Sequence, residues 1–370
     1  MTEYRVISSD SHIIEPENLW EKRIDPRFKD RAPRLLHEAE ADQWVCDGLR
    51  FGAIGINQQA GLRFENPEKL TPGGSMETVP LGGLDPHEHV KDMELDGVAG
   101  GVLYPSQGLT LFRVPATDVL SAAFRAYNDY LAEFCAPYPD QLKGIAMINL
   151  DDVADGVQEL ERAAGLGLAG AMISVNPILP YSHAAYDRFW ATAQDLEMPL
   201  SLHVGTMRWR PGLDTGGVVL QNPLDFPNRE YDPRQCINGM IFAGVFERYP
   251  KMRVGVVEFE VSWAPYFLSR MDNFYQQRAV GVQGTRFKED MLPSDFFRRN
   301  VFIGFQEDGL GMQLRHHIGV DNLLWGSDYP HAESTFPKSR EILEQIFQGV
   351  PEEEKAKIAG ENTARLYHFS

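Results

Sequence analysis

The chain has 370 residues, 43% of them hydrophobic and 24% charged, so it can bury a large core and is neither disordered nor fibrous. With 35 Lys and Arg against 53 Asp and Glu, its net charge of −18 disfavours nucleic-acid and anionic-membrane partners and favours a small-molecule ligand. We find no secretion signal and no apolar run long enough to span a membrane, and we expect a cytoplasmic protein. The three cysteines are widely spaced and lack a C-x-x-C motif, so any metal is expected to use other ligands.

Short β-branched or apolar runs alternate with helical patterns along the whole chain, which is typical of repeated βα units around a parallel sheet. Most of these runs are too hydrophobic to alternate, so we expect them to be buried on both faces. The predicted strands are Tyr4–Ser9, Gly101–Ser106, Leu142–Leu150, Leu168–Val175, Pro199–Val204, Met252–Phe259, Asn300–Gln306 and Asn322–Ser327.

Apolar residues at three- and four-residue spacing predict helices between these strands. The predicted helices are Asp85–Gly97, Ala116–Ala136, Asp151–Gly165, Ala184–Leu196, Arg234–Arg248, Trp263–Gln277, Gly309–Ile318 and Lys338–Gln348, with one extra helix in PEEEKAKIAGENTARLYHF at the C-terminus. This alternation predicts an α/β fold, a single (β/α)₈ TIM barrel that occupies residues 1–370 as one domain.

Two stretches do not fit the repeat, about 15–84 and about 207–233, and both are rich in Pro, Gly, Asn and charge. Each directly follows a predicted strand, so we interpret both as insertions in βα loops. Because βα loops lie at the C-terminal face of a barrel, where barrel enzymes carry their active sites, these insertions are expected to form a lid or an oligomer contact over the site.

Polar residues that core packing does not explain stand at the C-terminal ends of four predicted strands. They are Asp10, His12, His203, Glu258, Asp328 and His331. Period-two alternation places Asp10 and His12 on the same side of the first strand, so both can face one ion. Carboxylates and imidazoles that converge at the barrel face are the ligands that divalent metals use, as in a barrel metallohydrolase.

Five segments carry a resemblance to a known family: DSHIIEPENLW, LSLHVG, VVEFEVSWAPYFLSRMD, LLWGSDYPHAESTFPKSR and GENTARLYHF. The chain resembles the amidohydrolase superfamily, in the branch that contains aminocarboxymuconate-semialdehyde decarboxylase and aromatic-acid decarboxylases. The resemblance implies that His12, His203 and Asp328 are metal ligands. The first strand-one histidine of the family is Asp10 here, and its strand-six histidine is Glu258. This oxygen-rich ligand set makes manganese or iron as credible as zinc.

The leading hypothesis is a metal-dependent hydrolase or non-oxidative decarboxylase that acts on a small carboxylated or carbonyl-containing molecule. Asp10, His12, His203 and Asp328 would hold one ion, Asp328 would also shuttle a proton, and Glu258 would serve as general acid or base. A structural ion pair of Glu258 with an arginine remains an alternative.

A second hypothesis uses the surplus of acidic groups. Glu15, Glu258 and His331 would complete a second metal position, and the resemblance then implies a dinuclear iron oxygenase. A third hypothesis is a non-catalytic subunit of a hetero-oligomer. We expect the protein to form a homo- or hetero-oligomer under all three hypotheses.

Three residues of the loop after the fifth strand are candidate substrate contacts. Arg208 and Arg210 could pair with a substrate carboxylate in bidentate fashion, and Trp209 could stack on the substrate. Solvated loop charges are the alternative interpretation of the two arginines.

Overall fold

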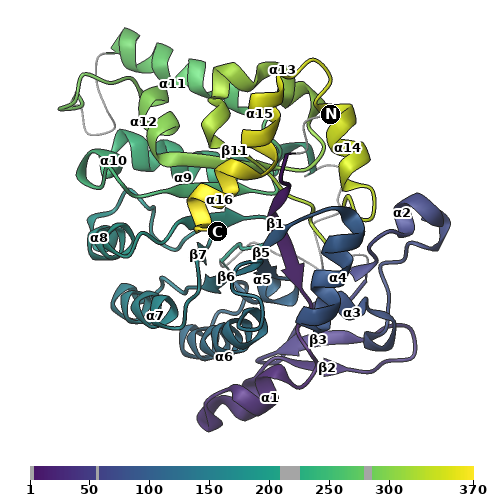
Figure 1. Ribbon diagram of the computed structural model, residues 1–370. Helices are drawn as coiled ribbons and strands as arrows, with labels where there is room; N and C mark the ends of the chain where they lie inside the picture. The colour runs from purple at the N-terminus through teal and green to yellow at the C-terminus, as the bar shows by residue number, and fades with distance from the viewer. Residues whose placement is uncertain (1–3, 56–57, 209–225, 279–285) are drawn as a thin grey trace.

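Eight parallel strands form a barrel in the computed structural model, which describes residues 4–55, 58–208, 226–278 and 286–370 (Figure 1). Their order around the barrel is β1-β5-β6-β7-β8-β9-β10-β11. The strands are β1 (Ile7–Ile13), β5 (Gly100–Pro105), β6 (Leu142–Met147), β7 (Gly170–Ile173), β8 (Leu200–His203), β9 (Val254–Val257), β10 (Val301–Phe305) and β11 (Leu323–Trp325). The predicted (β/α)₈ architecture is confirmed, because all eight predicted strands overlap strands of this barrel.

The barrel closes between β1 and the segment that follows β11. The Asp328 N–H donates to the Asp10 carbonyl at 2.8 Å, and the His12 N–H donates to the Tyr329 carbonyl at 2.6 Å. A Cβ atom at Gly326 would lie 2.5 Å from the Asp10 Cβ, so only glycine permits this approach. Closure therefore brings the polar residues of the first and last strands together.

Helices surround the barrel and cover the strands on the outside (Figure 1). They are α4 (Pro86–Asp96), α5 (Gln107–Leu111), α6 (Thr117–Cys135), α7 (Val153–Gly165), α8 (Asp187–Asp195), α9 (Tyr231–Phe242), α10 (Val245–Arg248), α11 (Ala264–Arg278), α12 (Pro293–Asn300), α13 (Gly309–Ile318) and α14 (Ser339–Ile346). Each overlaps a predicted helix except α5 and α12, which were not predicted. None of the described helices is long and apolar enough to cross a membrane.

Most predicted elements differ from the observed ones by a few residues at their ends, and three differ more substantially. The first strand runs to Ile13 rather than to Ser9, with a register shift between Ser8 and Ser11, so Asp10 and His12 lie within it. The predicted helix Arg234–Arg248 is two helices, α9 and α10, which are separated at Ala243 and Gly244. The predicted C-terminal helix is α15 (Glu352–Ala356), a π-helical turn (Lys357–Glu361) and α16 (Asn362–Tyr367).

The insertion after β1 contains regular structure that the sequence interpretation treated as loop. It holds α1 (Leu19–Arg23), α2 (Leu62–Glu65), α3 (Leu81–Leu84) and an antiparallel sheet of β2 (Arg34–Leu36), β3 (Gln43–Cys46) and β4 (Leu49–Ala53). The two-residue turn between β3 and β4 is Asp47-Gly48, with φ of 48° and 76°. Asp-Gly is a strong hairpin signal, so this turn was available in the sequence. The small sheet projects from one side of the barrel (Figure 1).

His89 on α4 gives the fold a testable pH dependence. The ring is wholly buried, and its Nδ1 lies 2.8 Å from the Gly82 carbonyl. Burial lowers the pKa of His89 from 6.5 to about 4, so the unfolded chain takes up a proton between these values and the folded chain does not. Stability therefore falls as the pH drops through this window. Between pH 7 and pH 5 we expect a loss of about 2 kcal/mol from this residue.

Urea unfolding of the native protein and of His89→Gln at both pH values measures this contribution. The variant should lose less stability on acidification than the native protein does. Equal losses in the two proteins would show that His89 titrates normally in the folded state.

Candidate metal centre

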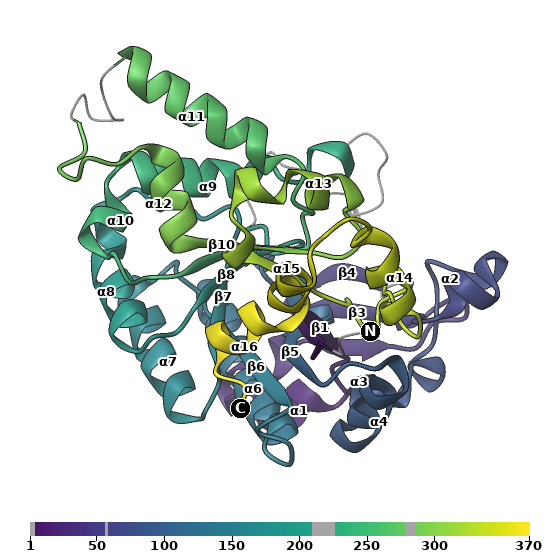
Figure 2. The ribbon, with the colours of Figure 1, turned by 45° about the horizontal axis from the view of Figure 1, so that its top comes forward.

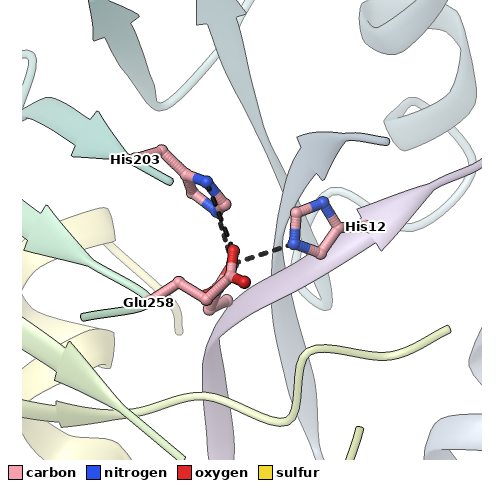
Figure 3. Close-up of side chains that lie close together, drawn as sticks. His12, His203 and Glu258 are labelled. Atoms are coloured by element: carbon pink, nitrogen blue, oxygen red, sulfur yellow. Dashed lines mark hydrogen bonds and ion pairs between the residues drawn. The ribbon is translucent and has the colours of Figure 1, made fainter. Parts of the chain in front are cut away.

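The C-terminal ends of β1, β8 and β9 and the segment after β11 converge at one face of the barrel. They bring together Asp10, His12, His203, Glu258 and Asp328, of which all but Glu258 are almost completely buried. Ligand atoms of the first four lie within 4.8 Å of one another. Figure 3 shows His12, His203 and Glu258 close together at this face of the barrel. The convergence predicted from the sequence is therefore present in the structure.

Backbone carbonyls fix the orientation of both histidine rings. His12 Nδ1 lies 2.8 Å from the Pro105 carbonyl oxygen, and His203 Nδ1 lies 2.9 Å from the Val204 carbonyl oxygen. Because a carbonyl oxygen can only accept, each Nδ1 must carry the proton in these contacts. A neutral ring then has a lone pair on Nε2, which is the arrangement that metal-binding histidines adopt.

The two Nε2 atoms face carboxylate oxygens. His12 Nε2 lies 3.3 Å from Asp10 Oδ1 and 3.1 Å from Asp328 Oδ1, and His203 Nε2 lies 3.2 Å from Asp10 Oδ1. Acceptor atoms at this separation repel one another unless a proton or a metal ion lies between them. Among the described residues, neither His12 Nε2 nor Asp328 Oδ1 has a hydrogen-bond partner of acceptable geometry, although both are buried. The arrangement therefore favours a proton or a metal ion between these nitrogen and oxygen atoms.

The pKa values of the residues in this cluster shift in the directions that attraction between its imidazoles and carboxylates produces. Burial alone would lower the pKa of His12, but the Asp10 and Asp328 carboxylates raise it well above its usual value. Burial would raise the pKa of Asp10, yet the two histidines hold it below its usual value. Positive charge is favoured at the centre of the cluster and negative charge at its carboxylates. Such a centre fits a divalent ion held by imidazole nitrogen and carboxylate oxygen.

His331 contacts both Asp328 and His12. Its Nδ1 lies 2.8 Å from Asp328 Oδ1, its Nε2 lies 3.0 Å from the Ser106 hydroxyl, and its ring stacks on that of His12 at 4.0 Å between centroids. Ligand atoms of His12, Asp328 and His331 form a second group within 4.8 Å. Both ring nitrogens of His331 are thus engaged by protein groups, which suits an orienting role.

Glu258 occupies a strained position just after β9. Its φ of 67° lies in the left-handed region, which residues other than Gly, Asn and Asp rarely adopt; Asp328 also lies there, with φ of 58°, but as an aspartate it tolerates this conformation. Such residues cost about 1–3 kcal/mol each and concentrate at functional sites. The Glu258 side chain is 13% exposed, and its Oε2 lies 3.5 Å from His203 Nδ1. Burial and the Asp328 and Asp10 charges raise the pKa of Glu258 well above its usual value.

The other predicted site residues do not join this cluster. Both Glu15 oxygens accept backbone N–H groups, from Gln107 and Gly108, at 2.8 Å. Arg208 is buried, and its Nε donates to Asp151 Oδ1 at 3.0 Å. Trp209 and Arg210 lie outside the described residues. The structure therefore gives Glu15 and Arg208 partners within the protein.

Two side chains beside the cluster were not among the predicted site residues. Ser106 holds His331, and the ring of Tyr104 lies 4.7 Å from that of His203 between centroids. The Tyr104 hydroxyl lies 2.7 Å from the Ser201 hydroxyl, in the interior of the barrel. The sequence carried a signal for each of these residues. Tyr104 and Ser201 are polar residues within largely apolar predicted strands, and Ser106 stands at a predicted strand end.

The Arg208–Asp151 ion pair gives a prediction that separates a structural role of Arg208 from substrate binding. Both side chains are less than 10% exposed, and Arg208 Nη1 also donates to the Val114 carbonyl at 2.8 Å. Arg208→Met leaves the Asp151 charge buried and unpaired, which should cost about 3–5 kcal/mol of the unfolding free energy. Denaturant unfolding measures the loss.

The double variant Arg208→Met, Asp151→Asn serves as the control, because it removes the unpaired charge and should recover part of the stability. Native stability in the single variant, combined with weakened substrate binding, would contradict the structural role.

A parallel barrel with imidazoles and carboxylates gathered at the C-terminal ends of its strands is the architecture of metal-dependent barrel enzymes. The sequence profile of the amidohydrolase family matches residues 106–369, and the chain belongs to this family. The predicted resemblance is thereby confirmed.

Decarboxylases are among the relatives of this chain. A gamma-resorcylate decarboxylase from Polaromonas sp. is 25% identical over 296 residues, which cover 69% of this chain and 81% of that protein. An amidohydrolase from Mycobacterium avium subsp. paratuberculosis has a similar structure, with a TM-score of 0.79, 21% identity and coverage of 99% of this chain and 98% of that chain. A dihydroxybenzoic acid decarboxylase from Polaromonas sp., solved with manganese and the inhibitor 2-nitroresorcinol, has a TM-score of 0.64, 17% identity and coverage of 99% and 97%.

Proposed function

We propose that this protein is a divalent-metal-dependent, non-oxidative decarboxylase of small aromatic carboxylic acids. The observation that carries the proposal is the buried cluster in which His12 Nε2 lies 3.3 Å from Asp10 Oδ1 and 3.1 Å from Asp328 Oδ1, and His203 Nε2 lies 3.2 Å from Asp10 Oδ1. The decarboxylases among the relatives support decarboxylation over hydrolysis or oxygenation. The manganese in a related structure supports manganese as the ion.

Four side chains would hold the ion: Asp10, His12, His203 and Asp328. When bound there, the ion supplies a Lewis acid that fixes a substrate carboxylate or phenolate and stabilises developing negative charge. The Pro105 and Val204 carbonyls keep both rings oriented for this task. His331 keeps Asp328 in place through the 2.8 Å contact to its Oδ1.

Non-oxidative decarboxylation replaces the carboxylate of the ring by a proton. The bond from the ring carbon to the carboxylate carbon breaks, CO₂ leaves, and the electron pair that remains on the ring takes up one proton, so no oxidant is consumed. Glu258 is the carboxyl group placed to deliver that proton, because it borders the cluster and is the most exposed of its acidic members. Burial of the remaining groups keeps water from the reacting carbon.

CO₂ release from a panel of hydroxybenzoates tests the proposal. The manganese-loaded protein is expected to release one CO₂ for each phenol formed, at the same rate with and without dioxygen. A 2,6-dihydroxybenzoate and a 5-carboxyvanillate should be included, because related structures are decarboxylases of these acids. Dioxygen uptake coupled to substrate loss, or ester or amide hydrolysis without CO₂ release, would overturn the proposal.

A further inference from the structure

A second candidate binding site lies at the opposite end of the barrel from the metal centre. A cavity of about 250 Å³ opens there at the N-terminal ends of β8, β9 and β11. Residues 193 and 194 at the end of α8 and residues 197–199 before β8 line one side of it, residues 251–253 before β9 line another, and α16 closes it. Figure 2 shows α15 and α16 across this end of the barrel.

Three cationic side chains line this cavity without carboxylate partners. They are Lys251, Arg253 and Arg365. Within the parts of the chain that the structure describes, none of the three has a carboxylate oxygen within 4.0 Å, whereas most other arginines there form an ion pair. Lys251 and Arg365 are exposed, and Arg365 Nη2 donates to the Asp321 carbonyl at 3.1 Å and to Asn362 Oδ1 at 3.0 Å.

Arg253 has fewer hydrogen-bond acceptors for its guanidinium than Arg365 does. Its Nε is buried and has no hydrogen-bond partner among the described residues, and its Nη2 reaches only the Asn322 Oδ1, at 3.4 Å. Burial lowers the pKa of Arg253, and the charge of Arg365 lowers it further. Arg253 is partly buried, and its buried Nε–H costs free energy unless an acceptor occupies the site.

The carboxylates of the same cavity do not neutralise these charges. Asp321 is paired with Lys357, whose Nζ lies 3.3 Å from Asp321 Oδ1. Glu197 also lines the cavity and makes no ion pair with the three cations. The remaining lining is partly apolar, with Met198, Met252 and Leu324 among its members. The cavity thus combines a cationic end with an apolar wall.

We propose that this cavity is a binding site for a small organic anion, with the acidic group of the ligand on Arg253 and its apolar body against the wall. The acidic group is a carboxylate or a phosphate, since both accept the two parallel hydrogen bonds that a guanidinium offers. Lys251 and Arg365 add charge at the mouth. The site is separate from the metal centre and does not depend on the proposed decarboxylase function.

Two probes distinguish the two acidic groups: 4-bromobenzoate for a carboxylate and inorganic phosphate for a phosphate. Titration calorimetry on the metal-loaded protein should show saturable binding of at least one of them. Crystals soaked in 4-bromobenzoate should show a bromine anomalous peak in the cavity, which separates this site from any binding at the metal centre.

Substitution of Arg253 is the decisive variant. Arg253→Met should weaken binding in the cavity by about 10- to 100-fold, the effect of losing a hydrogen bond to a charged group, and should remove the bromine peak there. Lys251→Met removes an exposed cation and should weaken binding by a few-fold without a risk to folding. Arg188→Met, an exposed arginine at the start of α8, is the matched control and should bind as the native protein does.

Three results would overturn the proposal. They are the absence of saturable binding by either probe up to about 10 mM, a bromine peak at crystal concentration only, and cavity binding that is unchanged in both Arg253→Met and Lys251→Met.

Discussion

His203→Ala is expected to abolish metal binding and to lower the rate of CO₂ release by about 10³-fold or more, while the barrel remains folded. The ring lies at the end of β8, and its Nε2 is one of the two imidazole nitrogens directed at the cluster. Loss of that ligand removes an ion that contributes several kcal/mol to transition-state stabilisation, and each 1.36 kcal/mol corresponds to a tenfold change in rate. Metal analysis of the purified variant and a CO₂-release assay measure the two effects.

His317→Ala is the matched control, because His317 is exposed on α13, away from the barrel interior. It should retain full metal content and rate. Far-UV circular dichroism establishes that both variants are folded. If His203→Ala kept native metal content and turnover, the assignment of the cluster as a metal centre would be wrong.

The second large effect is expected at Glu258. Glu258→Gln keeps the size of the side chain but removes its acidic proton, so it should lower turnover by roughly 10²–10⁴-fold, the usual contribution of a general acid or base. The four proposed ligands are unchanged, so the metal content should stay at one ion per chain. Single-turnover CO₂ release and metal analysis on the same preparation measure both quantities.

Glu260→Gln is a close control for this substitution. Glu260 belongs to the same segment and also has positive φ, but its carboxylate accepts the backbone N–H groups of Gln306 and Glu307, at 3.4 Å each. It should retain most of the activity. Two bound ions in the native protein, one of which is lost in Glu258→Gln, would instead make Glu258 a metal ligand and favour the dinuclear arrangement.

The strands and the position of the site could be predicted because both depend on local pattern. Buried parallel strands are short continuous apolar runs, and in a barrel their C-terminal ends must meet. Asp10 and His12 lie on one face because side chains alternate along a strand. The sequence interpretation therefore located the residues that converge, although it ended the first strand at Ser9, before Asp10 and His12.

The backbone conformation at the site could not be predicted. Asp328 and Glu258 both have positive φ. At Asp328, the backbone N–H also donates a tertiary hydrogen bond to the Asp10 carbonyl. Such contacts join residues that are hundreds of positions apart in the chain. Glu15 illustrates the same limit, because its partners are the N–H groups of Gln107 and Gly108 at the start of α5, which follows β5. No short-range pattern carries that information.

The insertion after the first strand shows a different limit. Its β3–β4 turn carries an Asp-Gly signal, but the sequence analysis interprets the whole stretch as a loop insertion from its content of Pro, Gly, Asn and charged residues. Arg208 similarly stands in a polar loop, where a substrate contact and a buried ion pair give the same sequence pattern. Only the position of Asp151, on the loop after β6, distinguishes the two.

We propose that the cluster of Asp10, His12, His203 and Asp328 holds the one ion on which decarboxylation depends. Titration of Mn²⁺ into the metal-depleted protein, with CO₂ release from a hydroxybenzoate measured at each step, tests this directly. We expect the depleted protein to be at least about 10³-fold slower and the rate to rise linearly to a plateau at one equivalent per chain. Full activity without metal, or a plateau reached only at two equivalents, would contradict this account.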